Sequence, residues 1–448
     1  MDARIEPSTV DGTTAAPPSK SYTHRALLAA AYGDGARVVT PLVSADTRAT
    51  ARAVEAFGAR VVSVDERDDD PAGDSVVPSE AGALAVEGFG GRPAVPADVI
   101  DCANSGTTLR LTTATAGLAD GGTVLTGDAS LRSRPQGPLL AAVESLGGRA
   151  RTTRGNGRAP LVVEGPIEGG RVSIPGDVSS QFVTALLFAG ARTDAGVRVD
   201  LETPLKSVPY VDITREVLAA FGVETERTAE GFAVGGDQSY ARTEPYAVPG
   251  DFSSASYLLA AGAVAAPERL VVENLYPDPQ GDAAVVDVLD RMGATVDWDR
   301  DAGAVTVERS ALRGTTVDVS DTPDLLPTVA AVGAVADGET RIENCEHVRH
   351  KETDRVAAMA EELDALGAAV EERSDTLVVR GGESRLTSAR VDGRGDHRLA
   401  MALSVVGLVA DGGTTVAGAE HVAVSFPEFF ETLADSGASV DLLERPTG

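Results

Sequence analysis

Hydrophobic and polar positions follow two helical patterns along the chain. In the first, apolar residues recur every three or four positions with acidic residues between them, as at Val356, Met359 and Leu363, which predicts an amphipathic helix over residues 351–366. Each such segment ends at a glycine that precedes a strand-like stretch, and glycine in this place is typical of a helix end. The six glycines lie 70 to 89 residues apart: Gly58, Gly147, Gly222, Gly293, Gly367 and Gly437.

The second pattern carries no charge on any face beyond the first turn, which predicts helices that are buried on all sides. It occurs at residues 25–32, 108–119, 180–191, 254–266, 325–336 and 398–410, usually followed by a β-rich run. Together the two patterns predict six repeats of buried helix, strand, amphipathic helix and strand. Chance alternation in an Ala- and Gly-rich chain is the alternative, but the even spacing favours repeats.

Proline and glycine mark a junction between the third and fourth repeats. Three repeats precede residue 247 and three follow it, with Pro245, Pro249 and Gly250 between them. Because these residues interrupt regular structure, we expect a domain boundary here. The chain should therefore form two similar domains that face each other across a cleft.

The predicted buried helices begin with the most polar strings in the sequence. A helix N-terminus presents unpaired N–H groups and the positive end of the helix dipole, so it binds anions well. Capping alone also favours Ser, Thr, Asp and Asn at these positions, and we interpret Ser253 and Ser254 as caps. The six strings are residues 18–25, 104–110, 176–181, 250–254, 321–324 and 395–398.

Capping does not explain the cations near these helix starts, because a cation there opposes the helix dipole. Two further basic strings, residues 132–135 and 349–355, are expected in loops, and in the second Lys351 and Arg355 would repel each other on one helical face. Such clusters predict a binding site for small phosphates or carboxylates, with ordinary surface arginines as the alternative. The cations at the helix starts are Lys20, Arg25, Arg110 and Arg398.

The composition excludes several kinds of partner. The 448 residues include 68 acidic and 39 basic ones, a net charge of −29 that repels nucleic acid and anionic membranes. No apolar run approaches the roughly 20 residues that span a bilayer, and residues 1–4 do not resemble a signal peptide. Two cysteines can form neither a disulfide framework nor a recognisable metal site. We expect a soluble, cytoplasmic protein with reduced thiols.

Lysine is almost absent, and this changes how each remaining lysine is interpreted. Only Lys20, Lys206 and Lys351 occur among the 39 basic residues. An acidic, lysine-poor surface suits a cytoplasm with molar salt, where self-repulsion is screened. The three lysines that remain are therefore candidates for function rather than for solvation.

Two acidic residues accompany the cations. Asp324 begins a predicted buried helix, and Glu352 lies between Lys351 and Arg355. Two carboxylates in a cationic cleft can act as a general base and a general acid. A helix cap for Asp324 and an ion-pair partner for Glu352 are equally good explanations from spacing alone.

These strings, taken in order, resemble the EPSP synthase family of enolpyruvyl transferases over essentially the whole chain. Neither Asn-x-Gly-Thr-x-x-Arg nor Lys-Glu-Thr-Asp-Arg is specific alone, but the two together are. The matching segments are Lys20-Ser21-x-Thr23-x-Arg25, Asn104-x-Gly106-Thr107-x-x-Arg110, Arg134-Pro135, Ser179-Ser180-Gln181, Pro323-Asp324, Lys351-Glu352-Thr353-Asp354-Arg355 and Asp396-His397-Arg398.

The resemblance implies a fold that agrees with the repeats. The family has a two-domain inside-out α/β barrel, built from six βαβαββ repeats, three per domain, with buried parallel helices. Carried over to this chain, residues 18–247 form one domain with repeats one to three, on the shikimate 3-phosphate side. Residues 1–17 and 248–448 form the other, with repeats four to six, and the active site lies in the cleft between the domains.

The resemblance also implies the reaction. The enolpyruvyl group of phosphoenolpyruvate passes to the 5-hydroxyl of shikimate 3-phosphate by addition and elimination, and phosphate is released. No metal and no cofactor are expected, the partners are these small anions rather than nucleic acid or membrane, and the protein is expected to be a monomer. Domain closure would exclude water from the intermediate.

Site residues carry over only where this chain matches the family motifs. Asp324 would accept the hydroxyl proton, Glu352 would protonate the methylene carbon, and Lys20 would act near the reacting hydroxyl. Shikimate 3-phosphate would contact Lys20, Ser21, Arg25, Ser179, Ser180, Gln181, Ser207, Tyr210, Asp324 and Lys351. Phosphoenolpyruvate would contact Lys20, Asn104, Gly106, Arg134, Gln181, Arg355 and Arg398.

Two positions depart from the family pattern, and one matching position makes a prediction. Val424 stands where many members have a lysine, so one phosphoenolpyruvate contact is missing or supplied by another residue, and His347 stands where many have an asparagine. Gly106 matches the residue that admits glyphosate in the family, which predicts inhibition competitive with phosphoenolpyruvate.

Two other functions remain as alternatives. The related UDP-N-acetylglucosamine enolpyruvyl transferases share fold and chemistry but typically use a loop cysteine, and residues 127–134 contain none. A non-catalytic anion-binding repeat scaffold would not need Asp324 and Glu352 in their motifs.

Overall fold

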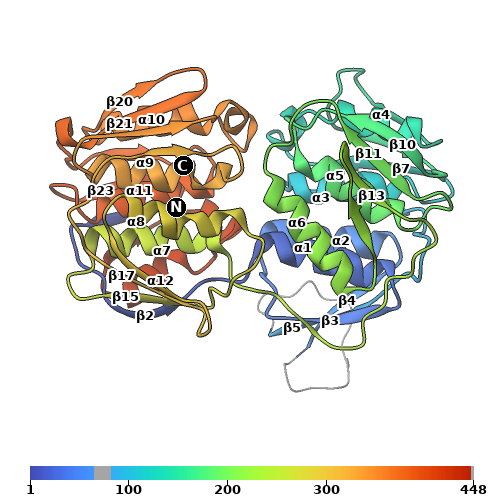
Figure 1. Cartoon of the computed structure of the whole chain (residues 1–448), viewed down its shortest axis with the longest axis horizontal. Coiled ribbons are helices and arrows are strands. Elements are labelled where there is room, and N and C mark those ends of the chain that lie inside the picture. The colour runs from blue at the N-terminus through green and yellow to red at the C-terminus, as the bar shows by residue number, and fades with distance from the viewer. Residues whose placement is uncertain (65–81, 445–448) are drawn as a thin grey trace. The chain divides into compact units, whose positions relative to one another are not determined.

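The chain forms two units that each fold around their own core (Figure 1). The structure is a computed structural model, and it describes residues 1–64 and 82–444. Unit 1 comprises Met1–Pro17 and Pro249–Gly448, and unit 2 comprises Pro18–Val248. Within the described residues each unit contains three four-stranded sheets.

The sheets repeat one topology, and the predicted six repeats are confirmed. In repeats two, three and five the elements follow the order βαβαββ along the chain. The first two strands pair in parallel, and the fourth strand pairs antiparallel with both the second and the third. A parallel pair needs a crossover, which explains why a buried helix stands between its strands.

Unit 2 holds the first three repeats. Its helices are α1 (Lys20–Tyr32), α2 (Ala45–Ala56), α3 (Gly106–Ala116), α4 (Gly137–Ser145), α5 (Ser180–Gly190) and α6 (Val208–Ala220). Its sheets are β14 (Tyr246–Ala247), β3 (Gly35–Val39), β5 (Ala83–Glu87) and β4 (Arg60–Val64); β6 (Ile100–Asp101), β7 (Gly122–Thr126), β9 (Leu161–Glu164) and β8 (Arg149–Thr152); β10 (Gly170–Ile174), β11 (Val197–Leu201), β13 (Gly231–Val234) and β12 (Thr225–Arg227).

Unit 1 holds the last three repeats. Its helices are α7 (Phe252–Ala265), α8 (Ala284–Arg291), α9 (Leu326–Val335), α10 (Arg355–Ala365), α11 (His397–Gly407) and α12 (Phe429–Asp435). Its sheets are β2 (Gly12–Ala15), β15 (Leu270–Glu273), β17 (Ala304–Glu308) and β16 (Thr295–Asp299); β18 (Thr316–Asp318), β19 (Glu339–Glu343), β21 (Thr376–Arg380) and β20 (Ala369–Glu372); β22 (Arg390–Asp392), β23 (Thr414–Ala417), β1 (Asp2–Glu6) and β24 (Ser439–Leu443).

Three repeats borrow a strand from elsewhere in the chain. The N-terminal strand β1 lies between β23 and β24, and β2 pairs in parallel with β15, so both belong to unit 1. Strand β14, which follows the third repeat, pairs with β3 of the first repeat. Each borrowed strand fills the place that a repeat's own strand fills elsewhere.

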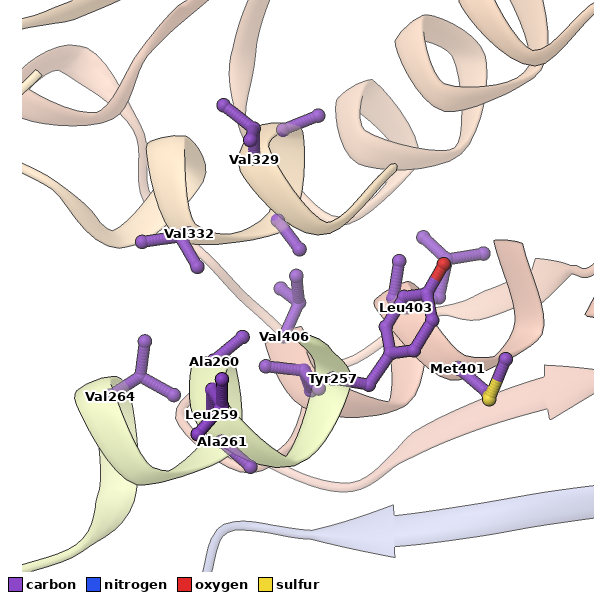
Figure 2. Packing of buried hydrophobic residues seen from close by; sticks show 14 of the residues in the cluster. Tyr257, Leu259, Ala260, Ala261, Val264, Val329, Val332, Met401, Leu403 and Val406 are labelled. Atoms are coloured by element: carbon purple, nitrogen blue, oxygen red, sulfur yellow. The ribbon is translucent and has the colours of Figure 1, made fainter. Parts of the chain in front are cut away.

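The charge-free helices form the interior of each unit, as their sequence predicts. In unit 1, every residue of α7 and α11 is buried, and side chains of α7, α9 and α11 pack against one another, among them Ala260, Val332 and Val406 (Figure 2). The sheets lie outside these helices (Figure 1). Burying helices while strands face outward produces an inside-out barrel.

Side-chain contacts show that the buried helices α1, α3 and α5 of unit 2 run in the same direction. At the end of α1, the Tyr32 hydroxyl donates to Thr115 Oγ1 near the end of α3 (2.9 Å), and its ring contacts Phe188 near the end of α5. In their N-terminal halves, Arg25 of α1 contacts Thr184 of α5, and Arg110 of α3 contacts Gln181 of α5. The N-termini of the three helices therefore gather at one end of unit 2.

The glycines that end the amphipathic helices have the predicted conformation. Each follows a helix and has a positive φ between 80° and 105°: Gly58, Gly147, Gly222, Gly293, Gly367 and Gly437. One predicted helix is too long, because α10 begins at Arg355 and not at residue 351. The Asp354 side chain accepts from Ala357 N and caps that start, and the preceding residues 351–353 are irregular.

Candidate active site

The predicted site residues form two sets, one in each unit. The unit 2 set contains Lys20, Ser21, Arg25, Asn104, Gly106, Arg134, Ser179, Ser180, Gln181, Ser207 and Tyr210. The unit 1 set contains Asp324, Lys351, Glu352, Arg355 and Arg398. In both units these residues lie at or near the N-terminal ends of helices, some of them buried and some amphipathic, where the helix dipoles favour anions.

Arg25 is a buried cation with neutral contacts. Its side chain is 1% exposed, and its guanidinium donates to Thr214 Oγ1 (2.9 Å), Ser21 O (2.8 Å) and Tyr210 O (3.0 Å). Burial lowers its pKa to about 10, so it stays charged near neutral pH. It lies more than a turn into α1 rather than in the first turn, and it draws α1 and α6 together around a positive charge.

Two more guanidiniums converge on the start of α3. Gly106 begins this helix, and a Cβ at that position would lie 3.1 Å from both Arg110 Nη1 and Arg134 Nη1. Arg134 donates to Asn104 Oδ1 (2.7 Å), which fixes it beside the helix N-terminus. A side chain at Gly106 would occupy the space between two cations and a helix start, which is where an anion fits.

Gln181 joins the starts of α3 and α5. Its Oε1 accepts from Arg110 Nη1 (2.5 Å), and its Nε2 donates to Thr107 Oγ1 (2.9 Å). Ser179 caps α5 by accepting from Gln181 N (3.3 Å). At the start of α6, Ser207 holds a left-handed conformation with φ of 59°. The hydroxyl and amide groups predicted to bind substrate are thus placed by helix starts.

Lys20 and Lys206, the two lysines of unit 2, both lie close to helix starts. Lys20 begins α1, and its Nζ lies 3.2 Å from Asp46 Oδ2 at the start of α2. The backbone N–H of Lys206 donates to Gly176 O (3.0 Å) and joins the loop before α6 to the loop before α5. The Lys20 ammonium group therefore lies between the starts of α1 and α2.

Arg355 is the centre of the unit 1 set. Its side chain is 1% exposed and donates to three carboxylates, each at 2.7 Å: Asp324 Oδ1, Glu352 Oε2 and Asp396 Oδ2. The other oxygen of Asp324 accepts from Arg398 Nη2, also at 2.7 Å. Asp324 therefore bridges the two arginines that are predicted to bind phosphoenolpyruvate.

These ion pairs shift the pKa values of Asp324 and Arg355. Burial acts to raise the pKa of Asp324, but Arg398, Arg355 and Lys351 outweigh it and hold that pKa well below the usual carboxyl range. Burial likewise acts to lower the pKa of Arg355, and Asp396, Glu352 and Asp324 reverse the effect. In this arrangement Asp324 is ionised and its basicity is suppressed by the arginines.

The structure corrects two local interpretations of the unit 1 set. Lys351 follows the 3₁₀ helix η4 (Glu346–His350) and lies outside α10, so it does not share a helical face with Arg355, although its charge still reaches Asp324. Asp324 lies within the 3₁₀ helix η3 (Pro323–Leu325), and the N-cap residues are Thr322 for η3 and Leu325 for α9. The capping explanation for Asp324 is therefore wrong, whereas the ion pair of Glu352 with Arg355 is present.

The caps of α7 were assigned to the wrong residues. Asp251 caps this helix by accepting from Ser254 N (3.2 Å), so Ser253 and Ser254 are not its caps. Instead, Ser253 Oγ donates to the carboxylate of Asp282. Asp282 was not predicted as a site residue, and its only sequence signal is a position just before an amphipathic helix.

Asp396 belongs to the Asp396-His397-Arg398 string, from which the sequence predicts a role only for Arg398. It is fully buried, caps α11 by accepting from Arg398 N (2.9 Å), and accepts from Arg355 Nε. The Asp-x-Arg spacing at a helix start was the available signal, because the same carboxylate can cap the helix and orient a cation. The departures from the family pattern lie in the same unit, with His347 in η4 and Val424 at the end of η6 (Ala419–Val424).

Two further properties bear on function. Among residues 1–64 and 82–444, no three His, Cys, Asp or Glu side chains are grouped so as to hold a metal ion. In the same residues, no helix is both long enough and apolar enough to cross a bilayer.

Known proteins resemble the chain in sequence and in fold. Residues 5–433 match the family described as EPSP synthase (3-phosphoshikimate 1-carboxyvinyltransferase). Proteins named 3-phosphoshikimate 1-carboxyvinyltransferase are 64% identical in Halobacterium salinarum, over 98% of this chain and 100% of that protein, and 49% identical in Methanosarcina acetivorans, over 98% and 99%. A solved EPSP synthase from Acinetobacter baumannii is 27% identical, with a TM-score of 0.81, and the match covers 98% of this chain and all of that one.

Proposed function

The chain belongs to the EPSP synthase (3-phosphoshikimate 1-carboxyvinyltransferase) family, and we infer that it transfers the enolpyruvyl group of phosphoenolpyruvate to the 5-hydroxyl of shikimate 3-phosphate. This reaction belongs to the shikimate pathway and releases phosphate. One observation carries most of the assignment: Asp324 lies between Arg355 and Arg398, which are cations of the kind that bind a phosphate or a carboxylate.

The unit 2 set is proposed to bind shikimate 3-phosphate. The argument rests on Arg25, a buried charge with neutral contacts, together with hydroxyl groups at the starts of α1, α5 and α6. A phosphate placed there would gain charge-assisted hydrogen bonds and the favourable ends of several helix dipoles. Ser21, Ser179, Ser180 and Ser207 would supply neutral donors.

Phosphoenolpyruvate is proposed to bind cations from both sets. Arg134 and the start of α3 at Gly106 come from unit 2, and Arg355 and Arg398 come from unit 1. We propose that both units contribute to one active site, with domain 18–247 on the shikimate 3-phosphate side. Closure around the two anions would remove water and strengthen each of these contacts.

Phosphoenolpyruvate binding would activate Asp324 as the base. In the described arrangement, Asp324 occupies Arg355 and Arg398 and its pKa is held low. A carboxylate or phosphate that takes over these guanidiniums releases Asp324, and the loss of its ion pairs raises its affinity for a proton. The base would then be strong only when phosphoenolpyruvate is bound.

The proton steps balance over addition and elimination. In addition, the 5-hydroxyl oxygen bonds to C2 of phosphoenolpyruvate, its proton goes to Asp324, and C3 receives a proton from Glu352. In elimination, Glu352 takes a proton back from C3, the bond between C2 and the phosphate oxygen breaks, and the proton held by Asp324 passes to the departing phosphate, which restores the double bond and both carboxyl groups. Lys20 and Lys351 would stabilise charge at the reacting oxygens.

A coupled assay of phosphate release tests this function. The enzyme is incubated with phosphoenolpyruvate and either shikimate 3-phosphate or UDP-N-acetylglucosamine, in concentrated KCl. We expect phosphate only with shikimate 3-phosphate. Release with the sugar nucleotide would assign the chain to the related transferases, and release with neither would leave a non-catalytic anion-binding protein.

A further inference from the structure

Asp282 is a buried carboxyl group that the proposed mechanism does not use. It lies in the 3₁₀ helix η2 (Gly281–Ala283), and its side chain is 3% exposed. Ser253 Oγ, in the first turn of α7, donates a hydrogen bond to its Oδ2. Burying a carboxyl group is costly unless it is neutral or compensated, so its protonation state matters.

The surrounding loop fixes Asp282 firmly. Gln280, two residues earlier, is also buried, and its Oε1 accepts from Phe252 N (3.0 Å) while its Nε2 donates to Gly250 O (2.7 Å). These bonds attach the segment before η2 to the start of α7. Asp282 therefore cannot turn toward solvent without breaking contacts at that helix start.

Charged groups from three elements act on Asp282. They are Asp251 at the cap of α7, Asp324 in η3 and Arg398 in α11. The charged side chains of the adjoining α8, Asp287, Asp290 and Arg291, are exposed. Burial and then the charge of Asp324 raise the pKa of Asp282 to about 7, against the opposing effects of Ser253 and Arg398. Two interacting carboxyl groups with separated pKa values are typical of functional sites.

We propose that Asp282 is a positioning residue for the unit 1 set, and that the charge of its carboxyl group sets how strongly Arg398 and its neighbours bind an anion. This inference rests on the proposed function, because the anion is phosphoenolpyruvate. When Asp282 is protonated and neutral, the positive charge of Arg398 acts only on Asp324 and the substrate. Ionised Asp282 adds a negative charge that opposes substrate binding and raises the basicity of Asp324.

Kinetics of Asp282→Asn and wild type, compared at about pH 6 and about pH 8, test the proposal. Asparagine has the same shape and can still accept from Ser253, but it cannot ionise. We expect similar KM values for phosphoenolpyruvate at the lower pH and, at the higher pH, a KM for the variant roughly threefold or more below wild type. Dividing one enzyme's KM by the other's removes the substrate's own titration.

Asp287→Asn is the matched control, since it removes the same charge from an exposed position of α8. It should follow wild type at both pH values. A ratio for Asp282→Asn that does not change with pH, or an equal change in the control, would overturn the proposal. If wild type released no phosphate at either pH, the proposed function would fail instead, so the two failures are distinguishable.

A second readout does not depend on activity. A buried carboxyl with a raised pKa keeps a proton that the unfolded chain has already lost, so wild type loses stability as pH rises from about 4 to about 7 and then levels off. Asp282→Asn should lack this part of the loss in chemical unfolding experiments. If that variant does not fold, Ser253→Ala replaces it. The hydrogen bond from Ser253 favours the ionised carboxylate, so its loss should move the pH at which KM for phosphoenolpyruvate changes to a higher value than in wild type. An unchanged pH would contradict the proposal.

Discussion

Arg355 depends on three carboxylates that lie at different distances along the sequence. Glu352 is a near neighbour, whereas Asp324 and Asp396 come from the starts of two other helical segments. A buried guanidinium is tolerated when such partners compensate it, and the partners in turn become costly when it is removed. Removal of Arg355 should be most costly at Asp396, because this carboxylate is fully buried.

Replacement of Arg355 by alanine should therefore destabilise the protein strongly. We expect a loss of roughly 3–5 kcal/mol in the free energy of unfolding, because Asp396 would be left as an uncompensated buried charge. Urea unfolding monitored by fluorescence measures it. Arg349→Ala is a suitable control, because Arg349 also contacts two carboxylates, Asp354 and Glu372, but at a more exposed position. This substitution should lower the free energy of unfolding by at most about 1 kcal/mol. Equal losses in both variants would contradict the role of burial.

Asp324 should be required for turnover but not for substrate binding. The variant Asp324→Asn keeps the shape of the side chain and cannot accept the hydroxyl proton, so phosphate release should fall by roughly 100-fold or more. Calorimetric binding of shikimate 3-phosphate should remain within a few-fold of wild type. Retained turnover would exclude Asp324 as the base.

At the scale of the helix start, Gly106 keeps open a space between Arg110 and Arg134. Gly106→Ala should weaken phosphoenolpyruvate binding, because its methyl group would stand 3.1 Å from both guanidiniums. We expect KM for phosphoenolpyruvate to rise roughly tenfold, about 1.4 kcal/mol, and glyphosate inhibition, predicted to compete with phosphoenolpyruvate in wild type, to weaken at least as much.

Gly137→Ala is the matched control for this helix start. Gly137 begins α4, and a Cβ there meets no atom within 4 Å. It should leave both constants unchanged. Wild-type activity that is insensitive to high glyphosate would refute the predicted inhibition, and an unchanged KM in Gly106→Ala would refute the importance of this space.

Elements whose determinants are local could be predicted from the sequence. The helix-ending glycines, the charge-free helices and their polar starts all follow from periodicity and composition, and the structure contains them. The helix predicted over residues 351–366 begins too early, because residues 351–354 carry no apolar side chain and the Asp354 cap sets the true start at Arg355. Asp282 was missed because its role depends on Ser253 and Asp324, which only the folded chain brings to it.

At the scale of the whole molecule, the excess of acidic residues is the feature with the largest expected effect on stability. The net charge of −29 and the scarcity of lysine indicate a surface that repels itself in dilute buffer. Relatives over 60% identical come from the halophilic archaea Halobacterium salinarum and Halorubrum lacusprofundi. Salt at molar concentration screens charges over a few ångströms, so it relieves this repulsion.

Stability and activity should therefore rise with salt. We expect the thermal unfolding midpoint and the rate of phosphate release to increase from about 0.1 M to about 1 M KCl, where the screening length falls to roughly 3 Å. Sucrose at matched osmolality provides the control, since it cannot screen charge. A protein that is equally stable and active in dilute buffer would contradict this prediction.

The central claim is that helix starts from both units bind the two anions of a single reaction. A crystal structure of the chain with shikimate 3-phosphate and glyphosate tests it most directly. We expect the shikimate phosphate on Arg25 and the serines of unit 2, glyphosate on Arg134, Arg355 and Arg398, and Asp324 beside the 5-hydroxyl, freed from at least one arginine. Ligands bound elsewhere, or Asp324 remote from that hydroxyl, would contradict it.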